Sequence, residues 1–207
     1  MRADTELFEA WRNGDRKAGN DLFQRHFEAI ERFFANKVDR DIEELVQETF
    51  ARCVSASERF EGRASFRTFL FGVAHRVLLE SFRRKHHHQP LDLETQSAVD
   101  LGAGPSSILA ERQEKRVLLE GLRRIPVDLQ VVLELHYWEG LTGAELSEIL
   151  GIPEATAYSR IRRAKQLLDK ALRRVAASPA VLRNTASNLD RWAASIRADL
   201  ELGQRVN

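Results

Sequence analysis

Apolar residues recur every three or four positions along most of this chain, which is the spacing of one face of an α-helix. The longest such series near the start of the chain consists of Leu22, Phe23, Phe27, Ile30, Phe33 and Phe34. No stretch shows the sustained two-residue alternation of a strand, and no hairpin dipeptide separates apolar runs. The pattern therefore predicts an all-α fold.

The distribution of phenylalanine divides this helical chain into two small domains. All 11 phenylalanines lie before residue 83, and the later half builds its apolar faces from Leu, Ile, Val and Ala. We expect helical domains over 1–88 and 108–175. Residues 89–107 contain two prolines, two glycines and three acids but no Lys or Arg, which is typical of a flexible acidic linker. Residues 176–207 are predicted to be a C-terminal helical extension, with one apolar face formed by Leu189, Trp192, Ile196 and Leu200.

The second domain contains the signals of a helix-turn-helix. Thr142 is a candidate N-cap, and Glu145 follows three residues later, as in a capping box. Gly151 can adopt the positive φ that a tight turn needs, and Pro153 is suited to the first turn of the next helix. Ala144 is small, and we expect it at the close crossing of the two helices.

The second of these helices concentrates positive charge in a chain whose formal net charge is only +1. From Pro153 to Arg174 there are seven basic residues and two acids. Local density of this kind attracts DNA phosphates, although a solvated basic face is the simpler alternative. Short hydroxyls followed by arginines suit a helix that enters the major groove. The predicted DNA-binding residues are Thr156, Tyr158, Ser159, Arg160, Arg162, Arg163 and Lys165.

Two segments of the first domain are candidates for binding. Residues 39–50 carry five acids against Arg40, which describes either a solvated helix or a partner surface. Residues 58–82 interleave aromatic and arginine side chains, a mixture that can stack unpaired bases and hold the nucleic-acid backbone. We assign Phe66, Phe69 and Phe82 to the core. The remaining candidates are the loop Glu61, Gly62, Arg63, Ala64 and Ser65, and the residues His75, Arg76, Arg83 and Arg84, which are expected on the outer face.

In their order and spacing, the segments DIEELVQETFARC, RFEGRASFRTFLFGVAHR and LTGAELSEILGIPEATAYSRIRRAK resemble bacterial RNA polymerase sigma factors. The resemblance is to the extracytoplasmic-function (ECF) group of the sigma-70 family and covers about residues 5–88 and 108–174. It implies an initiation factor that binds core RNA polymerase and directs it to specific promoters. Tyr158 stands where the family commonly has a basic residue, so the preferred promoter sequence can differ.

The resemblance also implies a role for each segment. The first domain is similar to sigma region 2, whose acidic helix would bind the clamp helices of the largest polymerase subunit through Asp41, Glu44, Gln47 and Glu48. The loop Glu61–Ser65, with His75, Arg76, Arg83 and Arg84, would recognise and open the minus-ten element. The second domain is similar to region 4, which would read the minus-thirty-five element and meet the flap of the second-largest subunit. An anti-sigma factor is a further partner that the resemblance allows.

Several other classes of function lack support. The single cysteine, Cys53, excludes a disulfide framework and a multi-cysteine zinc site, and we expect it in the core. Consecutive residues such as His86–His88 cannot easily converge on one metal ion, so we predict no metal and no cofactor. Neither a glycine-rich phosphate loop nor G-x-S-x-G is present, and we predict no enzyme activity.

No apolar run reaches the roughly 18 residues of a membrane span, and the start of the chain lacks a signal-peptide pattern, so we expect a cytoplasmic protein without membrane insertion. Two alternatives remain open. One is a stand-alone helix-turn-helix repressor or activator, and the other is a DNA-modifying enzyme with a helix-turn-helix appendage.

Overall fold

The computed structural model describes residues 2–39, 41–57, 64–85, 92–101 and 113–175, and eight helices lie within them. Their bounds are α1 (Asp4–Arg12), α2 (Arg16–Ala35), α3 (Ile42–Ala56), α4 (Phe66–Lys85), α5 (Gln113–Leu122), α6 (Val127–Tyr137), α7 (Gly143–Leu150) and α8 (Glu154–Val175). The described part of the chain contains no strand, only an isolated β-bridge between Ser97 and Pro126. The predicted all-α class is therefore confirmed.

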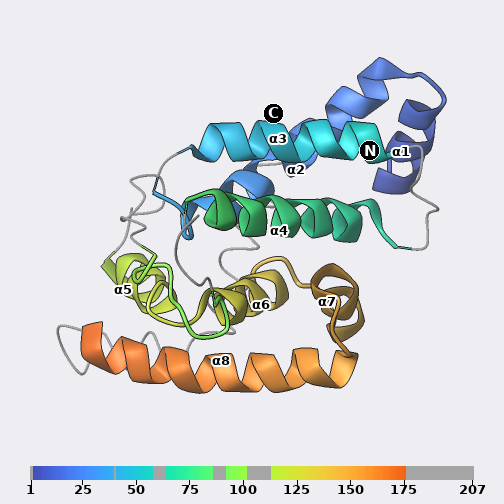
Figure 1. Cartoon of the computed structure of the whole chain (residues 1–207). Coiled ribbons are helices and arrows are strands. Elements are labelled where there is room, and N and C mark those ends of the chain that lie inside the picture. The colour runs from blue at the N-terminus through green and yellow to red at the C-terminus, as the bar shows by residue number, and fades with distance from the viewer. Residues whose placement is uncertain (1, 40, 58–63, 86–91, 102–112, 176–207) are drawn as a thin grey trace.

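Helices α1–α4 pack on one another and form the N-terminal bundle (Figure 1). Asp15 begins α2 as its N-cap, where its Oδ1 accepts hydrogen bonds from the amides of Lys17 and Ala18 at 3.0 and 3.1 Å. Aromatic rings fill the interior: the Phe23 and Phe50 centroids lie 5.0 Å apart. The phenylalanine-rich half of the sequence thus fills the interior of the N-terminal bundle.

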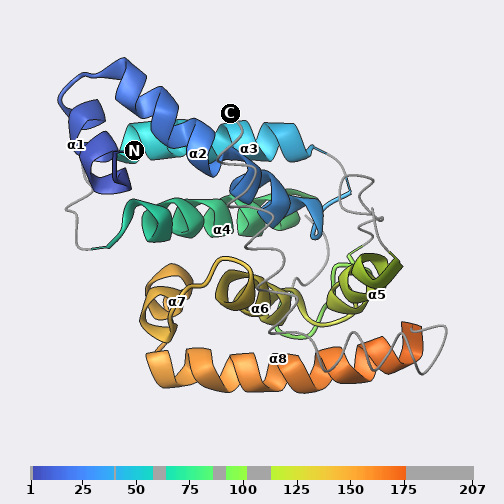
Figure 2. The ribbon, with the colours of Figure 1, turned by 180° about the vertical axis from the view of Figure 1, so that it is seen from behind.

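Helices α5–α8 form the C-terminal bundle, with α8 packed along α5, α6 and α7. Both views of the ribbon place α5, α6 and α7 between α4 and α8 (Figures 1 and 2). Helix α6 is buried on nearly every side and is apolar on nearly every side, as a central helix must be. Two of its buried residues, Gln130 and Glu134, are nevertheless polar.

The two bundles touch, because α4 packs against α7. The described part of the predicted linker, 92–101, also lies on the C-terminal bundle. Leu93, Ala98 and Leu101 are buried there, and the amide of Val127 donates to the carbonyl of Gln96 at 3.0 Å. These contacts give this part of the acidic segment a packing role that its composition did not indicate.

Local predictions agree with the described helices. Ser65 caps α4, since its Oγ accepts a hydrogen bond from the Thr68 amide at 3.0 Å. Cys53 is fully buried, and burial raises the pKa of its thiol to about 12. Phe66 and Phe82 are buried as expected. The extension 176–207 lies outside the described residues.

Candidate nucleic-acid interface

The turn between α7 and α8 has the predicted chemistry. Thr142 and Glu145 form a reciprocal capping box, in which the Thr142 amide donates to Glu145 at 2.8 Å and the Glu145 amide donates to Thr142 Oγ1 at 3.2 Å. Gly151 ends α7 with φ of +65°, a conformation that glycine adopts at little cost. Ser147 donates to the carbonyl of Ile152 at 2.6 Å, which ties α7 to the turn. The segment α7–turn–α8 is thus a rigid helix-turn-helix.

The close approach of the two helices involves a different residue from the one predicted. Ala144 is exposed, so the expectation that it lies at the crossing was wrong. Gly143 is the buried position, and a Cβ placed on it would lie 2.5 Å from ring carbons of Tyr158. The ring of Tyr158, 49% exposed overall, therefore covers the first turn of α7. The prediction missed by one residue, because the position at which α7 begins decides whether Gly143 or Ala144 faces α8.

Most of the predicted DNA-binding residues share the outer surface of α8. Tyr158, Ser159, Arg162 and Arg163 are exposed, and Thr156 and Lys165 are half-buried. The ammonium of Lys165 lies 5.2 Å from the centre of the Tyr137 ring. The exposed side chains among them carry guanidinium and hydroxyl groups, which can donate hydrogen bonds to DNA phosphates.

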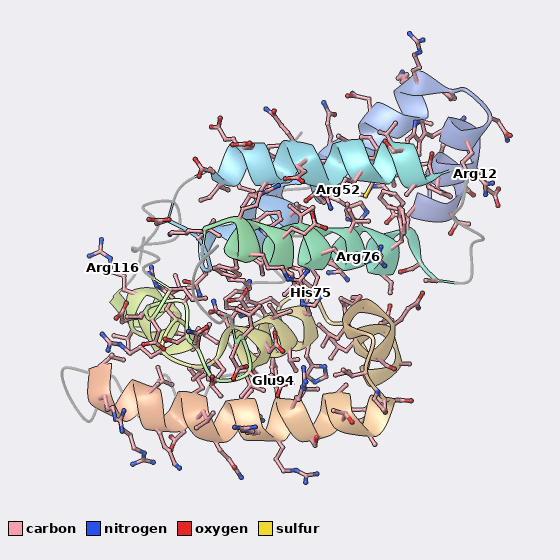
Figure 3. The ribbon with its side chains drawn as sticks, in the orientation of Figure 1. Arg12, Arg52, His75, Arg76, Glu94 and Arg116 are labelled. Atoms are coloured by element: carbon pink, nitrogen blue, oxygen red, sulfur yellow. The ribbon has the colours of Figure 1, made fainter. Side chains whose placement is uncertain are left out.

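Arg160 is the exception, because it already has acidic partners. Its guanidinium donates to Glu94 at 2.8 Å and to Asp128 at 3.3 Å. Figure 3 shows Glu94 beside α8, although it belongs to the predicted linker. Burial raises the pKa of Asp128, and the neighbouring Arg160 opposes that shift. The sequence did not indicate either partner, since they lie 66 and 32 residues away along the chain.

The acidic candidates lie at the start of α3. Asp41 takes a left-handed conformation with φ of +64° and no side-chain cap bond, and Asp41, Glu44 and Gln47 are all exposed. Glu48 is engaged instead: it accepts from Arg52 at 2.5 Å and from Arg84 at 3.0 Å. The hydrogen bond from Arg84, with the charge of Arg52, lowers the pKa of Glu48. A predicted polymerase-binding acid is therefore paired with Arg84, a predicted DNA-binding residue.

The residues predicted to bind the minus-ten element do not all lie on one exposed surface. Ala64 and Ser65 stand at the start of α4, and Arg76, Arg83 and Arg84 are exposed along it. The predicted loop residues Glu61, Gly62 and Arg63 lie outside the described residues.

His75 was expected on the outer face of α4, and this was wrong for the described conformation: it is only 8% exposed. Figure 3 shows His75 on the side of α4 that faces the C-terminal bundle. Its Nε2 is buried without a hydrogen-bond partner. Burial, assisted by the positive charges of Lys37, Arg76 and Arg160, lowers the pKa of His75 to about 4, against the effect of a hydrogen bond with the Ile149 backbone.

Within the described residues, no group of His, Cys, Asp or Glu side chains is arranged to hold a metal ion. None of the described helices combines the length and the apolar character needed to cross a bilayer. The histidines 86–88 lie outside the described part of the chain.

The fold and this interface define an all-helical protein with a helix-turn-helix suited to DNA. Comparison with known families is more specific. The family model described as "Sigma-70 region 2" matches residues 22–88, and the one described as "Sigma-70, region 4" matches residues 115–168. Together these matches span more than half of the chain, in the order region 2 then region 4. The chain belongs to the sigma-70 family, and its relatives identify it as a member of the ECF group.

Curated relatives extend this assignment over most of the chain. The ECF RNA polymerase sigma-E factor of Haemophilus influenzae is 27% identical over 176 residues, which cover 80% of this chain and 93% of the relative. The corresponding factor of Escherichia coli K12 is 26% identical over 176 residues, covering 80% and 92%.

Solved structures of other proteins share this fold. One is CnrH in complex with the cytosolic domain of CnrY, with a TM-score of 0.63, 21% identity, and coverage of 84% of this chain and all of that one. Another is the sigma factor RpoE of Bartonella quintana in complex with the anti-sigma factor NepR, with a TM-score of 0.58, 17% identity, and coverage of 74% and 95%. At these identities the likeness concerns the fold.

Proposed function

We propose that this protein is a transcription initiation factor that binds core RNA polymerase and directs it to a specific class of promoters. One observation carries the proposal: a region 2 match and a region 4 match occur in one chain, each on its own helical bundle. A stand-alone repressor or activator needs only the helix-turn-helix, so this alternative does not explain the region 2 match over residues 22–88. We further propose that the chain has no catalytic activity of its own and works in the cytoplasm with the polymerase.

The division of the chain follows from these roles. We propose a polymerase-binding and minus-ten domain over 1–88, a linker over 89–107, an upstream-element domain over 108–175, and an extension over 176–207. The packing of α1–α4 and of α5–α8 into separate bundles supports the two domain limits.

In this division α8 reads the minus-thirty-five element. The exposed residues Ser159, Arg162 and Arg163 lie in the first half of the helix, which is the part that a helix-turn-helix inserts into the major groove. Arginine can donate to guanine edges or to phosphates, and serine to either. The rigid turn fixes the angle at which these side chains meet the duplex.

The exposed acids at the start of α3 bind the polymerase. The side chains of Asp41, Glu44 and Gln47 are exposed, so they can contact the clamp helices of the largest subunit. Contacts of charged rim residues mainly set association rate and orientation. The second bundle meets the flap of the second-largest subunit.

The loop 61–65 and α4 open the minus-ten element. A base extruded from the duplex costs a few kcal/mol of unstacking, and the protein must return this in contacts to the flipped base. Exposed Arg76 and Arg83 can hold the backbone of the separated strand.

In vitro transcription tests the proposal. Purified core polymerase is supplied with a promoter library taken from the source genome, with and without this protein, and run-off products are sequenced. We expect discrete start sites that appear only when the protein is present and share two spaced elements upstream. Binding of the protein to free DNA without any effect on the polymerase would instead support a repressor.

A further inference from the structure

The first half of α8 carries an aromatic side chain on its exposed surface. The described residues include four exposed large hydrophobic side chains, namely Phe27, Val54, Val99 and Tyr158. Tyr158 alone among these four belongs to the helix-turn-helix, and its exposed fraction of 49% is the largest. A DNA duplex that approaches the start of α8 therefore meets an aromatic surface as well as the arginines described above.

The outer end of the Tyr158 ring lies against the start of α7, which packs beside α8 (Figure 1). A Cβ placed on Gly143 would be 2.5 Å from both Cε2 and Cζ of the ring and 2.8 Å from the hydroxyl oxygen. Any side chain at position 143 would thus compete with the ring for this space, which glycine leaves open. The contact holds the polar end of Tyr158 beside the first turn of α7.

The exposed part of Tyr158 is mostly apolar. The hydroxyl group is a small part of the surface of a tyrosine, so exposure of about half of the residue must expose ring carbons. These carbons carry no hydrogen-bond donor or acceptor, and they can distinguish bases only by apolar contact. In the major groove, the apolar group on a base edge is the C5-methyl group of thymine.

Neighbouring side chains on α8 offer different chemistry. Arg162, one turn further along the helix, is exposed and can donate to guanine or to phosphate. Ser159 donates its hydroxyl hydrogen to the Thr156 carbonyl at 2.9 Å, which leaves the lone pairs of its oxygen as acceptors. Arg160 is held by two carboxylates. A large apolar contact to a base is thus suited to Tyr158 and not to these neighbours.

Packing on Gly143 also lowers the entropic cost of such a contact. A ring that α7 already restrains loses little rotamer freedom when it meets a base. A basic side chain, which the family commonly has at this position, is flexible and donates hydrogen bonds to phosphate or guanine. Tyrosine therefore replaces hydrogen-bond donation by apolar contact at one position of this surface.

From this geometry we propose that Tyr158 is a specificity-determining residue that selects a thymine in the upstream element through contact of its ring with the C5-methyl group. Gly143 is the positioning residue, because it gives the ring its place on α7. The proposal rests on the proposed function for the identity of the DNA element. Recognition of the methyl group is a property of the helix-turn-helix itself.

The first experiment finds the thymine. Full-length protein and core polymerase are incubated with a promoter library randomised over the upstream element, and the bound duplexes are sequenced. We expect the wild type to enrich thymine at one position at least about threefold more than Tyr158→Ala does. Tyr158→Phe, which keeps the ring, should retain this preference. The control Gln166→Ala, which removes an exposed side chain about two turns further along α8, should also retain it.

The second experiment removes only the methyl group. Deoxyuridine replaces the selected thymine, and affinities for the two duplexes are measured by fluorescence anisotropy at fixed salt. We expect the wild type to bind the thymine duplex about two- to fivefold more tightly, the range expected for burial of one methyl group. Tyr158→Ala and Tyr158→Lys should bind both duplexes equally. Gly143→Ala, in which the ring is displaced, should show a smaller ratio than the wild type.

Two results would overturn the proposal. One is a library in which the wild type enriches no thymine, and the other is a thymine-to-uracil affinity ratio that is the same for the wild type and Tyr158→Ala. A ratio that persists in Tyr158→Ala would assign the methyl contact to another side chain, such as the exposed Ala155.

Failure of the proposed function is distinguishable from failure of this inference, because the affinities are measured with the full-length protein both alone and with core polymerase. A methyl-dependent ratio without any effect on the polymerase would refute the proposed function and leave the role of Tyr158 standing. Polymerase-dependent start sites with equal affinities for the thymine and uracil duplexes would refute only the role of Tyr158.

Discussion

At the scale of single residues, the contact between Gly143 and Tyr158 shapes the surface that we propose reads DNA. The tyrosine ring lies over the backbone of the first turn of α7, at a distance that leaves no room for a Cβ. This packing holds an exposed aromatic side chain in one place on the recognition helix. Tyr158 can therefore meet a base or a sugar without first losing rotamer freedom.

Gly143→Ala tests this contact. The added methyl group should displace the ring and lower the free energy of unfolding by about 1 kcal/mol, a typical cost of overpacking. In a Tyr158→Ala background the same change should be neutral or stabilising by up to about 1 kcal/mol, because alanine favours a helix over glycine. Chemical denaturation of the four proteins of this double-mutant cycle gives the coupling. Equal effects of Gly143→Ala in both backgrounds would exclude the contact.

His75 links folding to pH. Its pKa is lowered from 6.5 to about 4 in the described conformation, so the neutral ring is favoured there. Wherever His75 is exposed, it takes up a proton at higher pH. The folded state, in which His75 is buried, therefore binds fewer protons than the unfolded state between about pH 4 and 6.5. Its stability must fall as the pH is lowered through that window.

We expect acidification from pH 7 to pH 5 to remove roughly 2 kcal/mol of this contribution. The measurement is the free energy of unfolding at both pH values for the wild type and for His75→Gln, which cannot titrate. The difference between the two proteins isolates His75 from other groups, such as the Glu48 and Asp128 carboxylates. A glutamine variant with the same pH dependence as the wild type would contradict the lowered pKa.

At the scale of elements, the proposed function assigns polymerase binding to the acidic helix α3 and DNA binding to the basic helix α8. The exposed acidic residues of α3 can contact a protein surface, and the exposed basic residues of α8 can contact DNA. Each helix is fixed by its own bundle, since α3 packs on α2 and α4, and α8 packs on α5, α6 and α7. A change on the outer face of one helix should therefore leave the other task intact.

The variants Arg163→Ala and Glu44→Ala separate these tasks. Arg163→Ala should weaken promoter recognition by about 5- to 150-fold and leave core binding unchanged, because one base or phosphate contact is worth roughly 1–3 kcal/mol. Glu44→Ala should weaken binding to core polymerase and leave promoter choice unchanged. Fluorescence binding to core and run-off transcription with saturating protein measure the two steps. If both variants impair the same step, the assignment of the helices is wrong.

At the scale of the whole molecule, the segment 92–101 connects the bundles and also restrains the recognition helix. Its Leu93 and Leu101 anchor it on the C-terminal bundle, and its Glu94 reaches Arg160. Under the proposed function, Glu94 therefore competes with DNA for Arg160. Such a contact is weak, since Glu94 is 66% exposed and surface ion pairs contribute little.

Glu94→Gln should therefore leave the free energy of unfolding within about 1 kcal/mol of the wild type and strengthen duplex binding up to about fivefold. The matched control is Glu148→Gln, which removes one exposed carboxylate of the same bundle that is not paired with the recognition helix. Anisotropy titrations at two salt concentrations give both affinities. Identical gains for the two variants would mean that net charge alone, and not release of Arg160, is responsible.

What the sequence by itself determined is local. Helical periodicity, the Thr142–Glu145 capping box and the Gly151 turn depend on residues a few positions apart, and all are present in the structure. The phenylalanine-rich interior of the N-terminal bundle could be predicted because apolar residues at helical spacing face one another, although the buried residues of both bundles form one continuous cluster. The family resemblance predicted sigma regions 2 and 4 in this order, and the family comparisons confirmed that both are present.

Only the tertiary structure decided which polar groups meet across the chain. Lys37 and Glu134 are 97 residues apart, and Arg160 and Glu94 are 66 apart, so no periodic pattern could pair them. The burial of His75 also depends on α7 lying against α4, since its position within α4 leaves both environments open. Helix formation is governed by neighbours in sequence, whereas the pairing of charges is governed by neighbours in space.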